Sequence, residues 1–437
     1  MLLSIWVFAA SAIVLVTWLT IWLGELLTGH PGIFSVTPDA PTPLPAHSDA
    51  VIIVGLILGL FVMALVTGAV VNVNRFSLHG MYRSRLIRAY LGASNAERKA
   101  DPFTGFAISD NPRLHELWRT AAATYPLPII NTTLNITHGE ELAWQQRKSP
   151  VVLDDAVSLR QLRNGYRSSK QYGGPGGISV GTAVTISGAA ANPEMGQNSS
   201  PAMGFLMTLF NVRLGAWLGN TSERGQHTFR QPGPRQALRP LLTELFGLAD
   251  AAGRYVNLSD GGHFDNLGLY EVVLRRCRYI LISDAGQDDQ FTFEDLGNAI
   301  RKIRIDFGVR IEFKKEIRIL PRDPVGNDPK TGFYCATAII HYEDMDEGAQ
   351  PGKLVYVKPT ICGENPVPYD VYSYSRASDM FPHEPTSDQW FSESQFESYR
   401  ALGMHIFEQL PASSGSIQSF IEDMHARVDK LHGGTEA

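Results

Sequence analysis

The clearest hydrophobic pattern in this chain is a pair of long, uncharged apolar runs near its N-terminal end. The runs extend from Leu2 to Gly24 and from Ala50 to Val73 and consist mainly of aliphatic residues. Each exceeds the ~20 residues that a helix needs to cross a bilayer. The stretch between them, His30 to Asp49, is rich in proline and is not expected to be helical. The pattern predicts a transmembrane helical hairpin over residues 1–74.

Basic residues are distributed in a way that would orient this hairpin. Residues 1–74 contain no Lys or Arg, whereas six basic residues follow within residues 75–99. By the positive-inside rule, residues 75–437 would form a domain on the cytoplasmic side of a bacterial cytoplasmic membrane. Two other interpretations remain open. The first run could be a signal peptide, which would begin with basic residues and end at a small-residue cleavage site. Alternatively, the runs could form buried helices in the core of a soluble protein.

Residues 75–437 show shorter periodic segments. Apolar runs of strand length alternate with helical patterns, which favours an α/β layer fold with a largely parallel sheet. The expected strands are residues 128–136, 254–259, 279–283, 309–313, 334–342 and 354–358, and the expected helices are residues 182–191, 201–218, 263–276, 293–307 and 392–408.

Composition excludes several functional classes. The 437 residues carry a net charge of -6, and 44% of them are hydrophobic. A strongly basic nucleic-acid binder is therefore not expected. Three cysteines, Cys277, Cys335 and Cys362, show no Cys-x-x-Cys spacing, so neither a disulfide framework nor a cysteine zinc site is predicted.

Two aspartates follow expected strands, where sites in α/β sheets usually form. Asp260 precedes Gly261 and Gly262, and two glycines permit a turn with positive φ beside the carboxylate. Asp284 precedes Gly286 after the next strand. The alternative for Asp260 is a structural role as a turn residue or helix N-cap.

A metal or a nucleotide is less well supported. Asp260, His263 and Asp265 could cluster three ligands, but no second pair has recognisable ligand spacing, so no metal is predicted. The glycine-rich stretch Gly173 to Gly177 lacks the Lys-Ser/Thr of a phosphate-binding loop. No cofactor is expected.

A Gly-x-Ser-x-Gly pattern surrounds Ser179, from Gly177 to Gly181. In a nucleophile elbow a strand enters the turn and a helix leaves it, so that the serine is exposed. The residues before Gly177 do not read as a strand. The alternative is that Ser179 is the N-cap of a helix.

The run from Leu258 to Tyr270 (LSDGGHFDNLGLY) resembles the Asp-Gly-Gly region of patatin-like phospholipases, close to the bacterial branch allied to cytosolic phospholipase A2. Further matching stretches are residues 74–93, 177–193 and 387–405. The resemblance implies a three-layer α/β/α fold and hydrolysis of phospholipids or other acyl-ester lipids by a Ser–Asp dyad. It also implies that Asp260 is the base of that dyad, with Gly261 and Gly262 completing the motif.

The chain departs from the family in one respect. The family places a glycine-rich oxyanion loop and the nucleophile elbow well before the segment that residues 185–193 resemble, and residues 1–170 contain neither. We therefore expect a membrane-anchored lipid acyl hydrolase of which this chain carries the aspartate half. Its nucleophile would come from a missing N-terminal part or from a partner chain. The alternatives are a non-catalytic lipid- or protein-binding protein of the same fold and a site in which Ser179 is the nucleophile.

Overall fold

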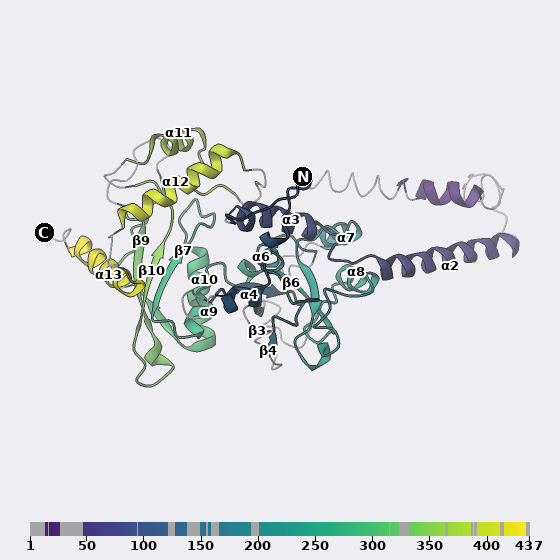
Figure 1. Cartoon of the computed structure of the whole chain (residues 1–437), viewed down its shortest axis with the longest axis horizontal. Helices are drawn as coiled ribbons and strands as arrows, with labels where there is room; N and C mark the ends of the chain where they lie inside the picture. Colours follow the sequence, from purple (N-terminus) through teal and green to yellow (C-terminus); the bar gives the residue numbers. More distant parts are fainter. Residues whose placement is uncertain are drawn as a thin grey trace, which may run out of the picture. The chain divides into compact units, whose positions relative to one another are not determined.

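The computed structural model describes most of the chain. The described residues are 14–15, 17–26, 47–93, 95–120, 127–137, 149–153, 156–158, 166–193, 201–313, 315–322, 332–362, 366–385, 388, 391–410 and 415–433. They divide into two compact units, an N-terminal unit, Met1–Phe264, and a C-terminal unit, Asp265–Ala437. Each unit is described separately below (Figure 1).

The N-terminal unit is built on a six-stranded sheet with the order β4-β3-β2-β1-β6-β5. Each pair of neighbouring strands is antiparallel. The strands are β1 (Ile130–Leu134), β2 (Ser149–Leu153), β3 (Ala156–Ser158), β4 (Tyr166–Ser168), β5 (Ala216–Gly219) and β6 (Tyr255–Asp260). Because β6 lies between β1 and β5, four of its six residues are buried.

Helices cover this sheet and extend from it. They are α2 (His47–Val70), α3 (Leu78–Leu86), a π-helical turn (Ile87–Gly92), α4 (Leu114–Thr120), α6 (Val180–Ser187), α7 (Pro201–Leu209) and α8 (Leu238–Leu245), with 3-10 turns at Ile108–Asp110, Glu223–Gly225 and Gly261–His263. The small-residue helix α6 packs on β1, β6 and α3. Its buried Ala183 and Ile186 join the core with Leu134 and Leu258 of the sheet.

The C-terminal unit contains a four-stranded sheet with the order β7-β10-β9-β8. The β7–β10 pair is parallel, and the β10–β9 and β9–β8 pairs are antiparallel. The strands are β7 (Tyr279–Ser283), β8 (Arg310–Glu312), β9 (Cys335–His341) and β10 (Gly352–Val357). The helices are α9 (Leu269–Leu274), α10 (Glu294–Phe307), α11 (Tyr369–Ala377), α12 (Glu393–Gln409) and α13 (Ile417–Gly433), and a 3-10 turn spans Tyr342–Asp344.

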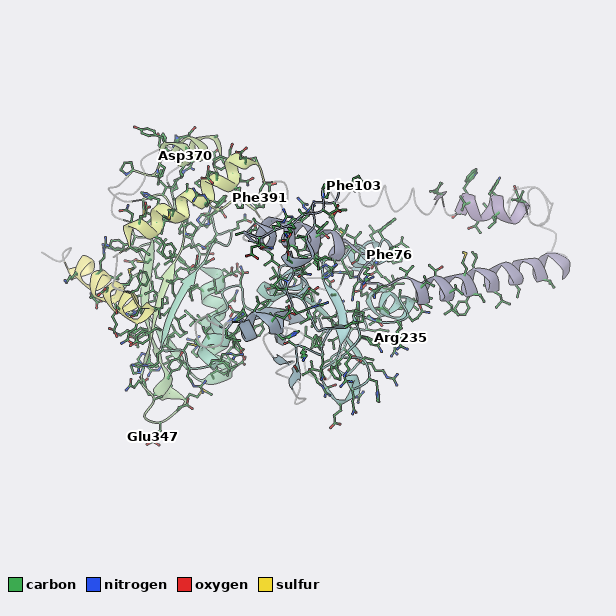
Figure 2. All side chains as sticks on the ribbon, viewed as in Figure 1. Phe76, Phe103, Arg235, Glu347, Asp370 and Phe391 are labelled. Carbon is green, nitrogen blue, oxygen red and sulfur yellow. The ribbon has the colours of Figure 1, made fainter. Side chains whose placement is uncertain are left out.

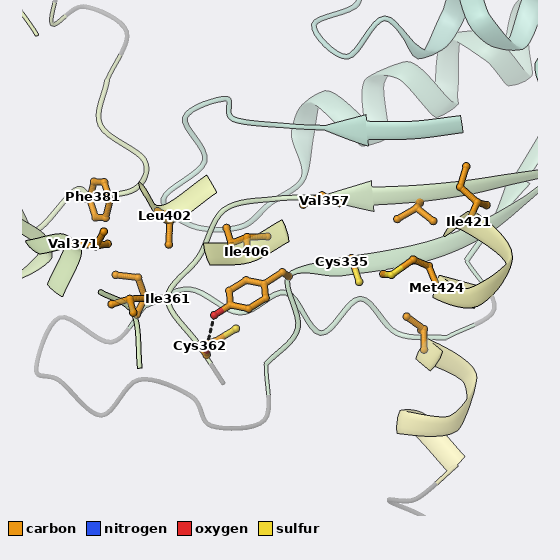
Figure 3. Packing of buried hydrophobic residues seen from close by; sticks show 14 residues of the cluster. Cys335, Val357, Ile361, Cys362, Val371, Phe381, Leu402, Ile406, Ile421 and Met424 are labelled. Atoms are coloured by element: carbon orange, nitrogen blue, oxygen red, sulfur yellow. Dashed lines mark hydrogen bonds between the residues drawn. The ribbon is translucent and has the colours of Figure 1, made fainter. Parts of the chain in front are cut away.

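Helices α12 and α13 supply much of the apolar core of the C-terminal unit. Figure 3 shows Leu402 and Ile406 of α12 and Ile421 and Met424 of α13 in one cluster with Val357 of β10. All five side chains are buried, which provides the main driving force for holding the helices on the sheet.

The expected single, largely parallel sheet is wrong. Strands β6 and β7, which the sequence pattern assigned to one largely parallel sheet, belong to different sheets, and β6 pairs antiparallel with β1 and β5. Mixed helices around two small sheets replace the expected three-layer α/β/α domain. The physical reason is that periodicity reveals which segments are strands but not which strands pair.

The expected transmembrane hairpin is also wrong, and with it the placement in a bacterial cytoplasmic membrane. Within the described ranges, no helix has both the length and the apolar character needed to cross a membrane. Of the first run, the structure describes residues 14–15 and 17–24, which are helical; residues 2–13 and 16, like the proline-rich stretch up to residue 46, lie outside the described residues. The second run forms α2, whose last turn receives a backbone hydrogen bond from Ala237 N–H to the Gly68 carbonyl at 2.7 Å.

Candidate functional site

Asp260 ends β6, where the strand passes into the 3-10 turn Gly261–His263. Its Oδ1 accepts a hydrogen bond from the Gly262 N–H at 2.7 Å, so the carboxylate caps this turn. The side chain is partly exposed, although the four preceding strand residues are buried. The capping role left open by the sequence is therefore observed, and the same hydrogen bond holds an accessible carboxylate in a defined direction.

Gly261 is required for a different reason from the one the sequence suggested. Neither Gly261 nor Gly262 has a positive φ. A Cβ on Gly261 would lie 2.3 Å from the backbone oxygen of Asn131 in β1. The first glycine therefore allows the turn to pass directly over the neighbouring strand.

Tyr82 of α3 lies within electrostatic range of Asp260. Burial raises the pKa of Tyr82, and the charge of Asp260 raises it further, so the phenol keeps its proton at neutral pH. Gly188, just after α6, makes room for this ring, because a Cβ there would lie 2.8 Å from the Tyr82 hydroxyl. The preceding Ser187 donates its hydroxyl proton to the Asn131 carbonyl at 2.7 Å.

A network of hydrogen-bonded, buried polar side chains lies along β6 and reaches the end of the strand where Asp260 lies. Asn257 donates from Nδ2 to Glu244 Oε1 at 2.9 Å and accepts at Oδ1 from Asn135 Nδ2 at 3.3 Å. The Ser259 hydroxyl donates to Asn135 Oδ1 at 3.0 Å and lies 3.4 Å from Nδ1 of His263. Ser259 is fully buried. These side chains therefore stiffen the support of the Asp260 turn.

Glu244 anchors the far end of this network through an ion pair with Arg213. The Arg213 Nη1 to Glu244 Oε1 distance is 2.7 Å, and both side chains are fully buried. Trp217 Nε1 also donates to Glu244 at 2.8 Å. Burial raises the pKa of Glu244, and the charge of Arg213 opposes that shift. Loss of either charge would leave its partner buried and uncompensated, which is strongly destabilising.

Ser179 occupies the N-cap of α6. Its backbone is extended, with φ -88° and ψ 155°, and its Oγ accepts from the Thr182 N–H at 3.2 Å. A nucleophile elbow is instead a strained turn entered by a strand. Residues 169–178 lead into Ser179 through turns and loop. The geometry fits the N-cap interpretation, and a nucleophilic Ser179 stays a prediction that this backbone does not favour.

Ser179 lines a cavity of about 750 Å³ in the N-terminal unit. Asp260 is not among its lining residues. This cavity therefore does not bring together the two residues proposed from the sequence.

Asp284 directly follows β7 and makes the same kind of local hydrogen bond as Asp260, because its Oδ1 accepts from the Gly286 N–H at 2.9 Å. Its surroundings differ. Lys358 Nζ lies 3.0 Å from Asp284 Oδ2, both side chains are buried, and the Tyr356 hydroxyl donates to the same oxygen. Asp284 is therefore part of a buried ion pair.

The metal interpretation gains no support from the geometry. Asp265 accepts backbone hydrogen bonds from Leu267 at 3.0 Å and Tyr270 at 2.8 Å, and burial raises its pKa. Among the residues that the structure describes, no three His, Cys, Asp or Glu side chains gather as metal ligands would.

The sequence alone does not single out Tyr82 or the buried polar side chains that contact β6. Tyr82 lies within residues 74–93, which resemble patatin-like phospholipases, but the resemblance implies no role for it. The small residues after Ser187 were the one available signal, because Gly188 creates the space that the Tyr82 hydroxyl occupies. Asn135, Asn257 and Glu244 carried no local signal, because their pairing depends on strand register and on the position of α8.

Comparison with known proteins gives little information. No known family model matches the chain. A serine protease, the SepA autotransporter of Shigella flexneri, is 24% identical over 239 residues, which are 50% of this chain. The match spans only 16% of the length of that protein. No solved structure matches. These similarities are too limited to establish a family.

Proposed function

We propose that this chain carries the aspartate half of a patatin-like carboxylic-ester hydrolase, with Asp260 as the base of a Ser–Asp dyad. The substrate would be a phospholipid or another acyl-ester lipid, and a partner chain would supply the serine. The observation that carries the proposal is the Asp260 carboxylate, which is partly exposed at the end of a buried strand and oriented by the Gly262 N–H at 2.7 Å.

Covalent ester hydrolysis gives this carboxylate a specific task. The serine oxygen attacks the ester carbonyl carbon while Asp260 accepts the hydroxyl proton, and that proton then passes to the departing alkoxide. Water then attacks the acyl-enzyme carbonyl while Asp260 accepts its proton, and that proton passes to the serine oxygen as the carboxylic acid is released. Tyr82 lies within electrostatic range of Asp260 and keeps its proton, because burial and then the charge of Asp260 raise its pKa.

The test is reconstitution of activity. The chain would be co-expressed with the gene product encoded upstream of it, and hydrolysis of p-nitrophenyl esters and phospholipids would be measured. Asp260→Asn should lower kcat by about 10²–10⁴-fold, because general-base catalysis contributes on that order. Undiminished turnover by this variant would refute the assigned role.

Asp250→Asn provides a matched control. Asp250 also lies in the N-terminal unit and also accepts a backbone hydrogen bond, from Gly253 at 2.7 Å. The Asp250→Asn variant should leave turnover unchanged. An equal loss in both variants would indicate general damage rather than a missing base.

The second candidate is a non-catalytic binding protein. It is favoured by the positions of three serines: Ser179 caps α6, Ser187 donates to a backbone carbonyl, and Ser259 is fully buried. This alternative predicts no labelling by a fluorophosphonate probe in the presence of partner chains. Labelling of the purified chain that survives Ser179→Ala would eliminate the version in which Ser179 is the nucleophile.

A further inference from the structure

The 750 Å³ cavity that Ser179 lines is strongly basic. Its wall contains Arg75, Arg83 and Arg113, and none of its lining residues is acidic. This volume lies within the range of roughly 300–1,000 Å³ that is usual for small-molecule sites. The cavity therefore has both the size and the charge for an anionic ligand.

The charge of the cavity comes from its arginines. His79 also lines it, but burial lowers the pKa of His79 to about 4, so this ring is neutral at pH 7. Because the Leu214 carbonyl can only accept, His79 Nδ1 carries the proton that it donates at 2.7 Å. Arginine remains protonated at every physiological pH.

Arg83 has a buried donor that is not satisfied. Its Nε is buried and has no hydrogen-bond acceptor among the described residues. Burial lowers the pKa of Arg83, and the like charge of Arg75 lowers it further, so the two guanidinium groups repel each other. An acceptor placed between them would satisfy the donor and relieve the repulsion.

Arg113 is positioned by the glycine-rich loop. Its Nη1 donates to the Gly177 carbonyl at 2.7 Å. Gly177 has φ +87°, and a Cβ there would lie 2.2 Å from the Ser169 carbonyl oxygen, so only glycine fits. Glu116 accepts from the Arg113 backbone N–H at 2.9 Å but does not line the cavity.

The first turn of α6 does not contribute free donors. The N–H groups of Val180, Gly181 and Thr182 already donate to Pro112, Asn111 and Ser179, respectively. The lining also includes the apolar side chains of Phe106, Ile108, Ile178 and Leu218. A ligand that fills this cavity would therefore combine an anionic group with an apolar body.

We propose that this cavity binds a small organic phosphate, with its phosphate group held by Arg75 and Arg83 and its apolar part against the apolar side chains of the lining. Guanidinium groups match phosphate oxygens in bidentate geometry, which favours phosphate or carboxylate over other anions. The site is separate from Asp260 and does not depend on the proposed hydrolase activity.

Calorimetric titration of the purified full chain tests this proposal. The probes are phenyl phosphate, inorganic phosphate, benzoate and neutral phenol. Phenyl phosphate should bind most tightly because it alone combines an apolar ring with a phosphate, and phenol should not bind measurably. Failure of phenyl phosphate to bind at millimolar concentration would overturn the proposal, as would binding of phenol or benzoate with equal affinity.

Arginine variants locate the site. Arg75→Gln, which removes an exposed side chain, and Arg83→Gln should each raise the Kd for phenyl phosphate about tenfold or more. The matched control is the double variant Arg235→Gln/Arg254→Gln in a second basic cavity, of about 410 Å³, in the same unit. Arg235 is labelled in Figure 2. This control variant should bind phenyl phosphate with the wild-type Kd. A loss of binding in the control variant alone would overturn the assignment of the site to Arg75 and Arg83.

Chemical protection provides a readout that does not depend on variants. Phenylglyoxal modifies accessible arginines, and the modified positions can be mapped by mass spectrometry. Phenyl phosphate should protect Arg75 and Arg83 but not Arg235. Protection of Arg235 alone, or equal protection of all three, would contradict the proposed site.

Discussion

Asp260 and Asp284 show how one local pattern can have two outcomes. Each aspartate lies at the C-terminal end of a strand, Asp260 as its last residue and Asp284 directly after it. Each precedes a glycine within two residues and accepts a backbone hydrogen bond at Oδ1, at 2.7 and 2.9 Å respectively. Asp284 is buried against Lys358 and Tyr356, whereas Asp260 is partly exposed. The comparison teaches that the tertiary surroundings, and not the local pattern, decide whether such a carboxylate is buried in an ion pair or stays partly exposed as a candidate base.

The largest expected difference concerns amide replacement of the two aspartates. Asp284→Asn should lower the free energy of unfolding of the C-terminal unit by about 3 kcal/mol, because Lys358 would lose its closest buried counter-charge. Asp260→Asn should lower the free energy of unfolding of the N-terminal unit by less than about 1 kcal/mol, since the amide oxygen can still accept the hydrogen bond from the Gly262 N–H. Hydrogen exchange, followed separately in the N-terminal and C-terminal units, measures the loss of unfolding free energy in each variant. Equal losses in the two variants would contradict the comparison.

An intermediate effect is expected at the glycines that follow the two aspartates. Gly261→Ala should destabilise the N-terminal unit by about 1–3 kcal/mol, because its Cβ would lie 2.3 Å from a backbone oxygen that cannot move freely. At Gly286 the closest atom to a new Cβ is Asp284 Oδ1, at 3.1 Å. Gly286→Ala should cost less than about 1 kcal/mol. Denaturant unfolding of both variants would show whether this order is reversed.

The smallest expected effect is a pH dependence around Asp284. Asp288 Oδ2 lies 3.7 Å from Lys358 Nζ. Burial acts to raise the pKa of Asp288, but backbone hydrogen bonds from Thr292 and Phe293 and the charge of Lys358 outweigh it and hold the pKa below the ordinary value of 3.8. The carboxylate therefore stabilises the fold above that value, and this contribution is lost as pH falls through the lowered pKa.

Asp288 is partly exposed, so solvent screening limits its contribution to about 1 kcal/mol or less. Thermal denaturation of the wild type and of Asp288→Asn between pH 6 and pH 2 checks the sign. The difference in Tm should be greatest near pH 6 and should shrink in acid. A difference that grows in acid would show that the Asp288 carboxylate does not act in this way.

Much of the secondary structure could be predicted from the sequence. The expected helix at residues 293–307 is α10, Glu294–Phe307, and the expected helix at 392–408 is α12, Glu393–Gln409. The expected helix at 263–276 is reduced to α9, Leu269–Leu274, because Gly268 adopts a left-handed conformation with φ 69° and starts the helix late. The strand at 334–342 is β9, Cys335–His341. Local periodicity was sufficient to predict a helix or strand where one apolar face dominates that segment.

The candidate site could be predicted only in part. The position of Asp260 at a strand end follows from the apolar residues before it and the glycines after it. Its electrostatic link with Tyr82, more than 170 positions earlier in the chain, could not be read from either segment. Nor could the sequence show that Gly261 passes over Asn131, because this depends on the antiparallel register of β1 with β6.

The sequence by itself determined the main helices and strands, the near balance of charge in residues 75–437 and the presence of an aspartate and two glycines after β6. The tertiary structure alone decided that β6 and β7 join different sheets, that Asp284 is buried against Lys358 while Asp260 is partly exposed, and that three arginines share one cavity. The reason is physical. Propensity and periodicity act over a few residues, whereas strand pairing, burial and charge neutralisation depend on segments that meet only in the folded chain.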